Sequence, residues 1–197
     1  MLNEVPLLEG YAHICGPVAY CAQKPWIMHG TVKDNLLFGA EEDAARLQEV
    51  IGACALAADL KELRYGVDTI IGERGINLSG GQKARVSLGR AAYQHTTART
   101  YVLDDPLSAV DMHVAKHLMD ECLGSQRGLL RHTTRILVTH QLQYIDQADI
   151  VVVVKDGAIA ACKPPSAFTP EELAAYELAA SHADSPGESG VKGRADA

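Results

Sequence analysis

Five consecutive residues near the middle of the chain, Leu78-Ser79-Gly80-Gly81-Gln82, could bind an anion. Glycines let a backbone come close to a ligand, and a helix that starts here would point its unpaired N–H groups outward. The dipole of such a helix favours negative charge at its N-terminus. The Ser79 hydroxyl adds a donor for a terminal phosphate oxygen. The same residues also fit a capping box with Ser79 at the N-cap and Gln82 at N3, followed by a flexible turn, so both interpretations stay open.

Two carboxylates, Asp104 and Asp105, follow the apolar run Tyr101 to Leu103. A carboxylate at the C-terminal end of a buried parallel strand lies where open α/β sheets bind ligands. Asp104 could hold Mg²⁺, usually through water, and Asp105 could polarise an attacking water. The structural alternative is that both residues simply end a strand in a turn before Pro106.

Two further polar residues follow strand-like runs in the same way. His140 comes after the run that ends Leu137-Val138-Thr139, and Gln23 comes after Val18 to Ala22. A histidine in this place is more often a hydrogen-bonded structural residue than a catalytic one. The Gln23 side chain could reach a metal ion or a water, although by itself it indicates almost nothing.

The elements expected around these residues alternate between strands and helices, which is typical of an α/β fold with a buried, mainly parallel sheet. Strands are expected at 18–22, 101–103, 135–139 and 150–154, with a hairpin turn at Asp156-Gly157. Helices are expected from a capping box at 31–34, through 41–63, from Ser79, around Val114 to Cys122, and from Thr169-Pro170.

Composition limits the possible partners. The 197 residues carry a net charge of −7 and no basic stripe, which argues against a nucleic-acid partner. The five cysteines form no C-x-x-C pair, so we expect reduced thiols in a cytosolic compartment. No apolar run approaches the roughly 20 residues that span a bilayer, so a role at a membrane would act through a partner.

Taken in order, these motifs resemble the nucleotide-binding domain of ABC transporters. Gln23 matches the Q-loop, Leu78 to Gln82 the signature motif, Asp104-Asp105 the end of the Walker B strand, Ser108-Ala-Val-Asp111 the D-loop and His140 the H-loop. The resemblance covers about residues 1–183. It implies a P-loop NTPase-like ABC ATPase domain with a helical signature subdomain at about 31–93, and leaves 184–197 as a disordered linker.

Smaller matches resemble exporters of the multidrug-resistance-associated (C) subfamily. They are Gln23-Lys-Pro-Trp-Ile-Met28, Thr31 to Gly39, Asp104 to Asp111 and Leu137 to Leu142. Within that subfamily the pattern is similar to the first of two nucleotide-binding domains. There Asp105 stands where the catalytic glutamate is usual, and the site is taken to bind ATP but hydrolyse it slowly.

The resemblance implies ATP and Mg²⁺ as cofactors. Asp104 and Gln23 would hold the metal, while Asp105, His140 and Gln23 would serve catalysis. The nucleotide would contact Leu78, Ser79, Gly80, Gly81, Gln82, Ser108 and Asp111, with the signature acting in trans on ATP held by a partner domain. The implied partners are a second nucleotide-binding domain and transmembrane domains, which would place the chain at the cytoplasmic face of a membrane.

Two departures from the family pattern weaken autonomous catalysis. No G-x-x-x-x-G-K-[ST] occurs in the 197 residues, so we expect an N-terminal truncation that removes the first strands and the P-loop. Asp105 is one C–C bond shorter than glutamate, about 1.5 Å. Alternatives to an exporter motor are a nucleotide-gated module of a channel or channel regulator, a soluble ABC protein of translation or repair, and an inactive truncated product.

Overall fold

The computed structural model describes residues 6–11, 13–72, 77–94 and 96–183, and the side chains as far as Tyr176. The described residues form two compact units, one ending at Thr139 and the other beginning at His140. Each unit is considered by itself. The linker predicted for 184–197 lies outside the described residues.

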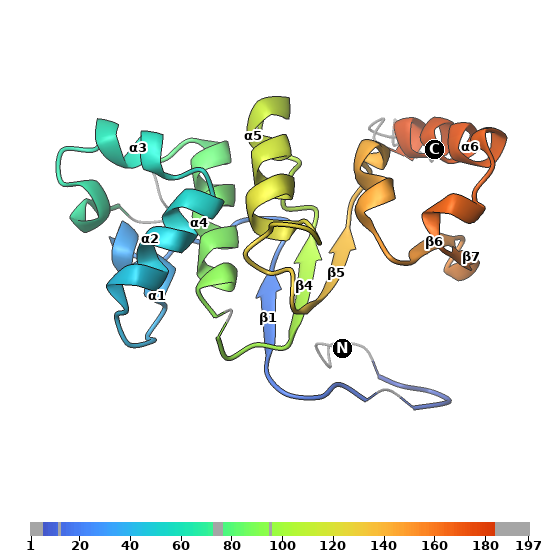
Figure 1. Ribbon diagram of the computed structural model, residues 1–197, viewed down its shortest axis with the longest axis horizontal. Helices are drawn as coiled ribbons and strands as arrows, with labels where there is room; N and C mark the ends of the chain where they lie inside the picture. Colours follow the sequence, from blue (N-terminus) through green and yellow to red (C-terminus); the bar gives the residue numbers. More distant parts are fainter. Residues whose placement is uncertain (1–5, 12, 73–76, 95, 184–197) are drawn as a thin grey trace, which may run out of the picture. The chain divides into compact units, whose positions relative to one another are not determined.

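A three-stranded parallel sheet organises the first unit (Figure 1). Strand β4 (Thr100–Asp104) lies between β1 (Val18–Cys21) and β5 (Thr134–Val138), with Cys21 opposite Leu103 and Asp104 opposite Val138. The parallel direction agrees with the sequence prediction. It brings the C-terminal ends of all three strands to one edge of the sheet, where the predicted ligand-binding residues follow them.

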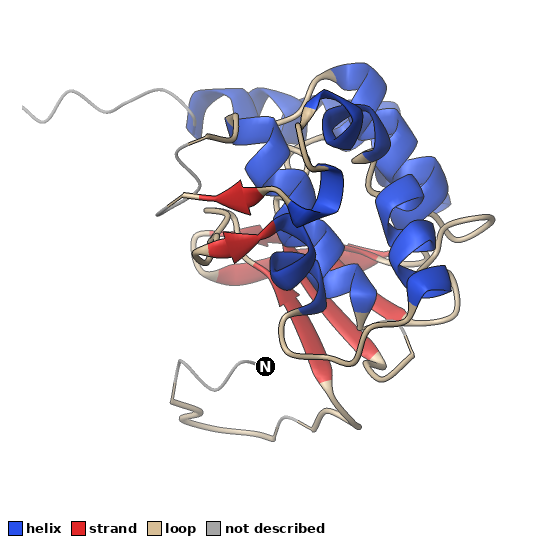
Figure 2. Cartoon of the chain, turned by 90° about the vertical axis from the view of Figure 1, so that its left-hand side faces the viewer, coloured by secondary structure: helices blue, strands red, loops and turns tan. Residues whose placement is uncertain are grey.

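One face of this sheet is covered by helix α4 (Gly80–Tyr93), and Figure 2 shows helices of this unit gathered on one side of the strands. Ala19, Cys21, Tyr101 and Leu103 lie on the covered face and are buried. The opposite face is more accessible to solvent: Tyr20 is 44% exposed and Val138 is 54% exposed. Parallel sheets are usually covered on both faces, so this open face departs from the usual pattern.

The segment before α4 begins with the short strand β2 (Gly30–Thr31), which pairs antiparallel with β3 (Ile70–Ile71). Helix α1 (Val32–Leu37) starts at the capping box predicted for Thr31 and Asp34, with both reciprocal hydrogen bonds present. It packs on α4 at Gly89, where an added Cβ would lie 2.7 Å from Cδ2 of Leu36. An alanine at this position would require the Leu36 side chain to shift.

The prediction of helical structure through 41–63 was wrong in one respect, because the chain breaks into two helices. Helix α2 (Ala44–Ala53) is capped by Asp43, and α3 (Ala57–Glu62) follows, before a 3₁₀ turn η1 (Gly66–Asp68). The break falls at Cys54 and at Ala55, whose φ of +52° is left-handed. A residue in that conformation ends a helix.

The helix predicted around Val114 to Cys122 is also composite. Helix α5 (Met112–His117) continues directly into η3 (Leu118–Leu123), a six-residue π-helix. Its side chains Leu118, Met119, Cys122 and Leu123 are buried, whereas Val114 of α5 is only half-buried. Helix α2 packs against η3.

The second unit contains the hairpin of β6 (Val151–Lys155) and β7 (Ala158–Lys163), with Asp156 and Gly157 at positive φ in the predicted turn. The two strands pair in antiparallel register, as the predicted hairpin requires. The unit also holds η4 (Leu142–Gln147), η5 (Pro165–Ala167) and α6 (Pro170–Ala183). None of the helices in the described part of the chain is both long and apolar enough to cross a bilayer.

Candidate functional site

The N-terminus of α4 is formed by the predicted Ser79 motif. The Ser79 Oγ accepts from the backbone N–H of Gln82 at 3.2 Å, and the Ser79 N–H donates to Oε1 of Gln82 at 2.9 Å. The capping box, one of the two interpretations that the sequence left open, is therefore present. Ser79 and Gly80 are exposed while Leu78 is buried, so the start of the helix faces solvent. Backbone N–H groups of such a helix start remain suited to an anion.

An acidic residue from α3 fixes the first two turns of α4. The Asp59 carboxylate accepts from Nε2 of Gln82 at 3.0 Å and from Nη2 of Arg85 at 2.6 Å. The side chains of Asp59 and Arg85 are 17% and 11% exposed, so the ion pair is largely shielded from solvent. Both ends of the Gln82 amide are thus engaged within the chain. Asp59 could not be found from the sequence pattern, because 26 positions separate it from Arg85.

Gly81 joins the start of α4 to the loop that follows β4. A Cβ added to Gly81 would lie 3.0 Å from the carbonyl oxygen of Ala109 and 3.8 Å from Cγ1 of Val110. At Gly80, by contrast, an added Cβ would meet nothing within 4 Å. The two glycines therefore differ: Gly81 permits a close backbone contact, while Gly80 leaves open space at the helix start.

The carboxylates after β4 occupy distinct environments. Asp104 is the last residue of the strand and is half-buried, whereas Asp105 is 7% exposed. The backbone of Asp105 has a φ of +46°, and its N–H donates to the carbonyl of Val138 at the end of β5 (2.9 Å). Its own carbonyl accepts from the Ser108 hydroxyl at 2.9 Å. A left-handed aspartate is tolerated because its short polar side chain can form local hydrogen bonds. Strained backbone of this kind is often found at functional sites.

Gln23 is exposed and follows β1 by two residues, so it lies at the same edge of the sheet as Asp104. An amide oxygen and a carboxylate are ligands that suit Mg²⁺. No cluster of three or more His, Cys, Asp or Glu side chains in the described residues could hold a metal ion. Mg²⁺ is commonly bound by one or two side chains together with phosphates and water. Asp104 and Gln23 would therefore suit a Mg²⁺ site completed by the phosphates of a ligand better than a site made by protein side chains alone.

Asp111 caps α5. Its carboxylate accepts from the backbone N–H groups of His113 (2.9 Å) and Val114 (3.0 Å). The Val114 N–H, followed by that of His113, lowers the pKa of Asp111 from its ordinary value. The structure thus gives Asp111 a helix-capping role and leaves the predicted nucleotide contact as a prediction.

His140 opens the second unit, two residues beyond the end of β5, and its side chain is exposed. The first unit therefore contains all the other residues predicted for the site. Within it, the fold brings Gln23, Asp104 and Asp105 to one edge of the sheet and joins Gly81 to the loop after Asp105.

An aromatic cluster that the sequence only partly indicated lies on the segment after Gln23. The Arg90 guanidinium lies 4.9 Å from the Trp26 ring centroid and 5.0 Å from that of Phe38. It donates to the carbonyls of Trp26 and Asn35 and to Oδ1 of the fully buried Asn35. Trp26 is 56% exposed and Phe38 50% exposed, whereas Ile27 is 5% exposed. The Ile27 side chain therefore packs in the core, while the two aromatic rings remain accessible.

Known proteins similar to the chain are ABC transporters. No protein-family model matches it. The chain is 53% identical over 159 residues to ATP-binding cassette sub-family C member 2 of Mus musculus, and 52% identical over 159 residues to multidrug resistance protein mrp-7 of Caenorhabditis elegans. In each case the match covers 81% of this chain and 10% of the relative. ABC transporter C family member 7 of Arabidopsis thaliana is 45% identical over 184 residues, 93% of this chain and 12% of the relative. The chain therefore spans only about a tenth of the length of the C-family transporters that it matches.

Proposed function

We propose that the chain is part of the ATP-binding and ATP-hydrolysing motor of an ABC-type exporter, and that its Ser79 motif acts in trans on ATP held by a partner domain. The observation that supports this most is the solvent-facing start of α4, where Ser79 and Gly80 are exposed. A second nucleotide-binding domain could present a triphosphate there. The N–H groups of the first helical turn and the Ser79 hydroxyl would then donate to its terminal phosphate oxygens.

The contact between Gly81 and Ala109 gives this proposal a mechanical component. It ties the phosphate-facing helix start to the loop that leaves Asp104 and Asp105. Asp59 holds the same helix start from the other side through Gln82 and Arg85. A displacement of α4 by a bound phosphate would therefore be transmitted to the segment after β4. Such coupling is what an ATP-driven motor requires.

The acidic edge of the sheet would serve the chain's own nucleotide site. Asp104 and Gln23 would hold Mg²⁺, which neutralises phosphate charge when bound. Asp105 would orient an attacking water and accept its proton. The predicted catalytic role of His140 is a separate prediction. Asp105 has a shorter reach than glutamate, which agrees with slow hydrolysis and with the first of two nucleotide-binding domains. General bases typically contribute about 10²–10⁴-fold, so a misplaced carboxylate oxygen would forfeit part of that factor.

The Trp26–Phe38 cluster would contact the transmembrane domains of the exporter. Two half-exposed aromatic rings, 5.8 Å apart and held by Arg90, form an apolar patch that a membrane-embedded partner can cover. The complete assembly would lie at the cytoplasmic face of a membrane.

The test is a chimera in which this chain replaces the matched 159 residues of the mouse relative. We expect ATP-dependent uptake of that transporter's own labelled substrate into inverted vesicles to be retained. Ser79→Arg in the chimera should abolish uptake, because the bulky cation blocks the helix start. Ser125→Arg, at an exposed serine of a surface turn, should leave it unchanged. Equal uptake by both variants at equal membrane insertion would contradict the proposed role of Ser79.

A further inference from the structure

Two buried cysteines from distant parts of the chain lie in contact within the first unit. Cys54, at the C-terminus of α2, and Cys122, in η3, have their sulfur atoms 4.0 Å apart although 68 positions separate them. Both side chains are 0% exposed, and neither is in a disulfide. The other buried cysteine, Cys21, contacts the Ser87 hydroxyl at 3.7 Å. Cys15 and Cys162 are exposed.

Local structure on both sides directs these thiols toward each other. Cys54 ends α2 with its N–H donating to the Val50 carbonyl (2.9 Å), and the left-handed Ala55 then turns the chain away. Cys122 lies in the π-helical segment, whose wider turn changes which side chains face the interior. π-Helical segments are rare and occur frequently at functional sites. The loop after η3 is held over Cys122 by the Leu130 N–H, which donates to the Cys122 carbonyl at 3.0 Å.

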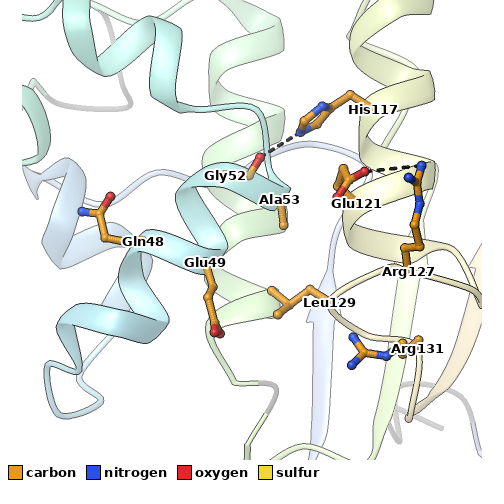
Figure 3. A pocket seen from close by; sticks show the side chains of 9 residues that line it. All are labelled: Gln48, Glu49, Gly52, Ala53, His117, Glu121, Arg127, Leu129 and Arg131. Atoms are coloured by element: carbon orange, nitrogen blue, oxygen red, sulfur yellow. Dashed lines mark hydrogen bonds and ion pairs between the residues drawn. The ribbon is translucent and has the colours of Figure 1, made fainter.

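An open pocket of about 480 Å³ lies directly over the seam between α2 and η3 (Figure 3). Its lining includes Ala53 and Glu121, the immediate sequence neighbours of the two cysteines. None of the residues predicted for the nucleotide site is among the described residues that line it. Two polar contacts lie at this seam and its rim, His117 Nε2 to the Gly52 carbonyl at 2.8 Å and Arg127 to Glu121 at 3.6 Å. Transient opening of these contacts would admit a small oxidant.

We propose that Cys54 and Cys122 are an oxidisable dithiol, which a peroxide converts into a disulfide that ties α2 to η3. One thiolate attacks the peroxide, the O–O bond breaks, and a sulfenic acid forms with release of hydroxide or water. The second thiol attacks that sulfur, an S–S bond forms, and a second water leaves. Overall, two thiols and one hydrogen peroxide give one disulfide and two waters.

The closed protein protects this pair from oxidation. The hydrogen bond with Cys122, together with burial, raises the pKa of Cys54 well above its ordinary value. Because the thiolate is the reactive form, oxidation should be slow in the closed state and faster when the seam opens or the pH rises. A disulfide formed there would fix α2, which also packs on α4, to the segment that continues from α5. It would restrict any movement between these elements.

The experiment uses the full 197-residue chain carrying Cys15→Ser and Cys162→Ser, which removes the exposed thiols. After hydrogen peroxide treatment we expect a mass loss of two hydrogens and a linkage between tryptic peptides 47–61 and 117–127 under non-reducing conditions. The melting temperature should rise by about 5–10 °C and return to its original value with dithiothreitol.

The matched control is the same background with Cys122→Val, which fills the site without a thiol. It should show neither the linked peptides nor the temperature rise. The proposal is overturned if the chain with Cys15→Ser and Cys162→Ser shows no linkage between 47–61 and 117–127 at any peroxide exposure or raised pH under which it stays folded. The same holds if the linkage forms only in urea. Peptide mapping of the chain with Cys15→Ser and Cys162→Ser tests the proposal even if the Cys122→Val chain fails to fold. The result of this mapping does not depend on the proposed transport function.

Discussion

The backbone of Gly81 lies so close to Ala109 that a Cβ added to the glycine would lie 3.0 Å from the alanine carbonyl oxygen. The contact is to backbone, which cannot move aside as a flexible side chain can. We therefore expect Gly81→Ala to destabilise the chain by about 1–2 kcal/mol, measured from the urea unfolding midpoint. Gly80→Ala is the matched control, because open space surrounds that position. It should be neutral or stabilise slightly, by up to about 1 kcal/mol. Equal effects of the two changes would disprove the close contact.

The Asp59–Arg85 pair should matter more than an exposed ion pair. The Asp59 carboxylate accepts hydrogen bonds from Arg85 and Gln82 in a mostly shielded position, and Asp59→Asn removes its negative charge. We expect this change to lower the free energy of unfolding by about 1–3 kcal/mol. Lys116→Gln breaks an exposed i,i+4 pair with Asp120 and should leave the urea midpoint unchanged. A larger effect of Lys116→Gln than of Asp59→Asn would contradict this ranking.

Arg90 should report directly on the aromatic cluster, because Trp26 is the only tryptophan in the sequence. Arg90→Lys keeps the charge but loses the planar contacts with Trp26 and Phe38 and most of the forked hydrogen bonds. We expect a red shift of the tryptophan emission and a loss of about 1–3 kcal/mol in the free energy of unfolding. The exposed Arg127→Lys serves as the control. An unchanged emission spectrum for Arg90→Lys would show that the guanidinium does not shield the ring.

Asp111 should make the stability of the chain depend on pH. Its pKa is lowered in the folded state, so its charged form stabilises α5 at pH values above the ordinary carboxyl pKa of about 3.9. That stabilisation is lost as the pH falls through the lowered, folded-state value. Asp111→Asn keeps a capping acceptor without the charge. The difference in stability between the unmutated chain and this variant should be constant from about pH 7 to 5 and shrink below about pH 4. A difference that stays constant down to pH 3 would exclude the lowered pKa.

The 197-residue chain should not bind ATP on its own with measurable affinity. Its sequence has no G-x-x-x-x-G-K-[ST] loop, so it has no nest of backbone N–H groups for the β-phosphate and no lysine to pair with it. Titration calorimetry with ATP and Mg²⁺ should give no heat of binding at millimolar nucleotide. Saturable binding at micromolar nucleotide would contradict this prediction and indicate that Asp104 and Gln23 form a more complete site.

Several features that the sequence predicted correctly are local ones. The capping boxes at Thr31 and Ser79 and the turn at Asp156-Gly157 depend on residues at most three positions apart, and the structure contains all three. The break at Ala55 was missed because alanine is the best helix former, and nothing in the neighbouring sequence requires its positive φ. Tertiary packing overrides the propensity there.

For the candidate site, the parallel strands made its placement predictable. Residues that follow parallel strands must meet at one edge, which is where Gln23 and Asp104 lie. The supporting contacts were not predictable in the same way. Asp59 with Arg85, and Asn35 with Arg90, join residues 26 and 55 positions apart, and no spacing rule connects them. The role of Asp111 as a helix cap was predictable from its position before α5, but a motif-based interpretation passed over it.

The half-open side of the β1–β4–β5 sheet has a consequence for the chain in solution. Tyr20 and Val138 place apolar surface in contact with water on a flat array of strands, where a second copy could adsorb without any specific fit. The net charge of −7 opposes this attraction at low ionic strength, and salt screens the repulsion. The purified chain should therefore remain dispersed in dilute buffer and become turbid as salt is added, which is the reverse of ordinary salting-in.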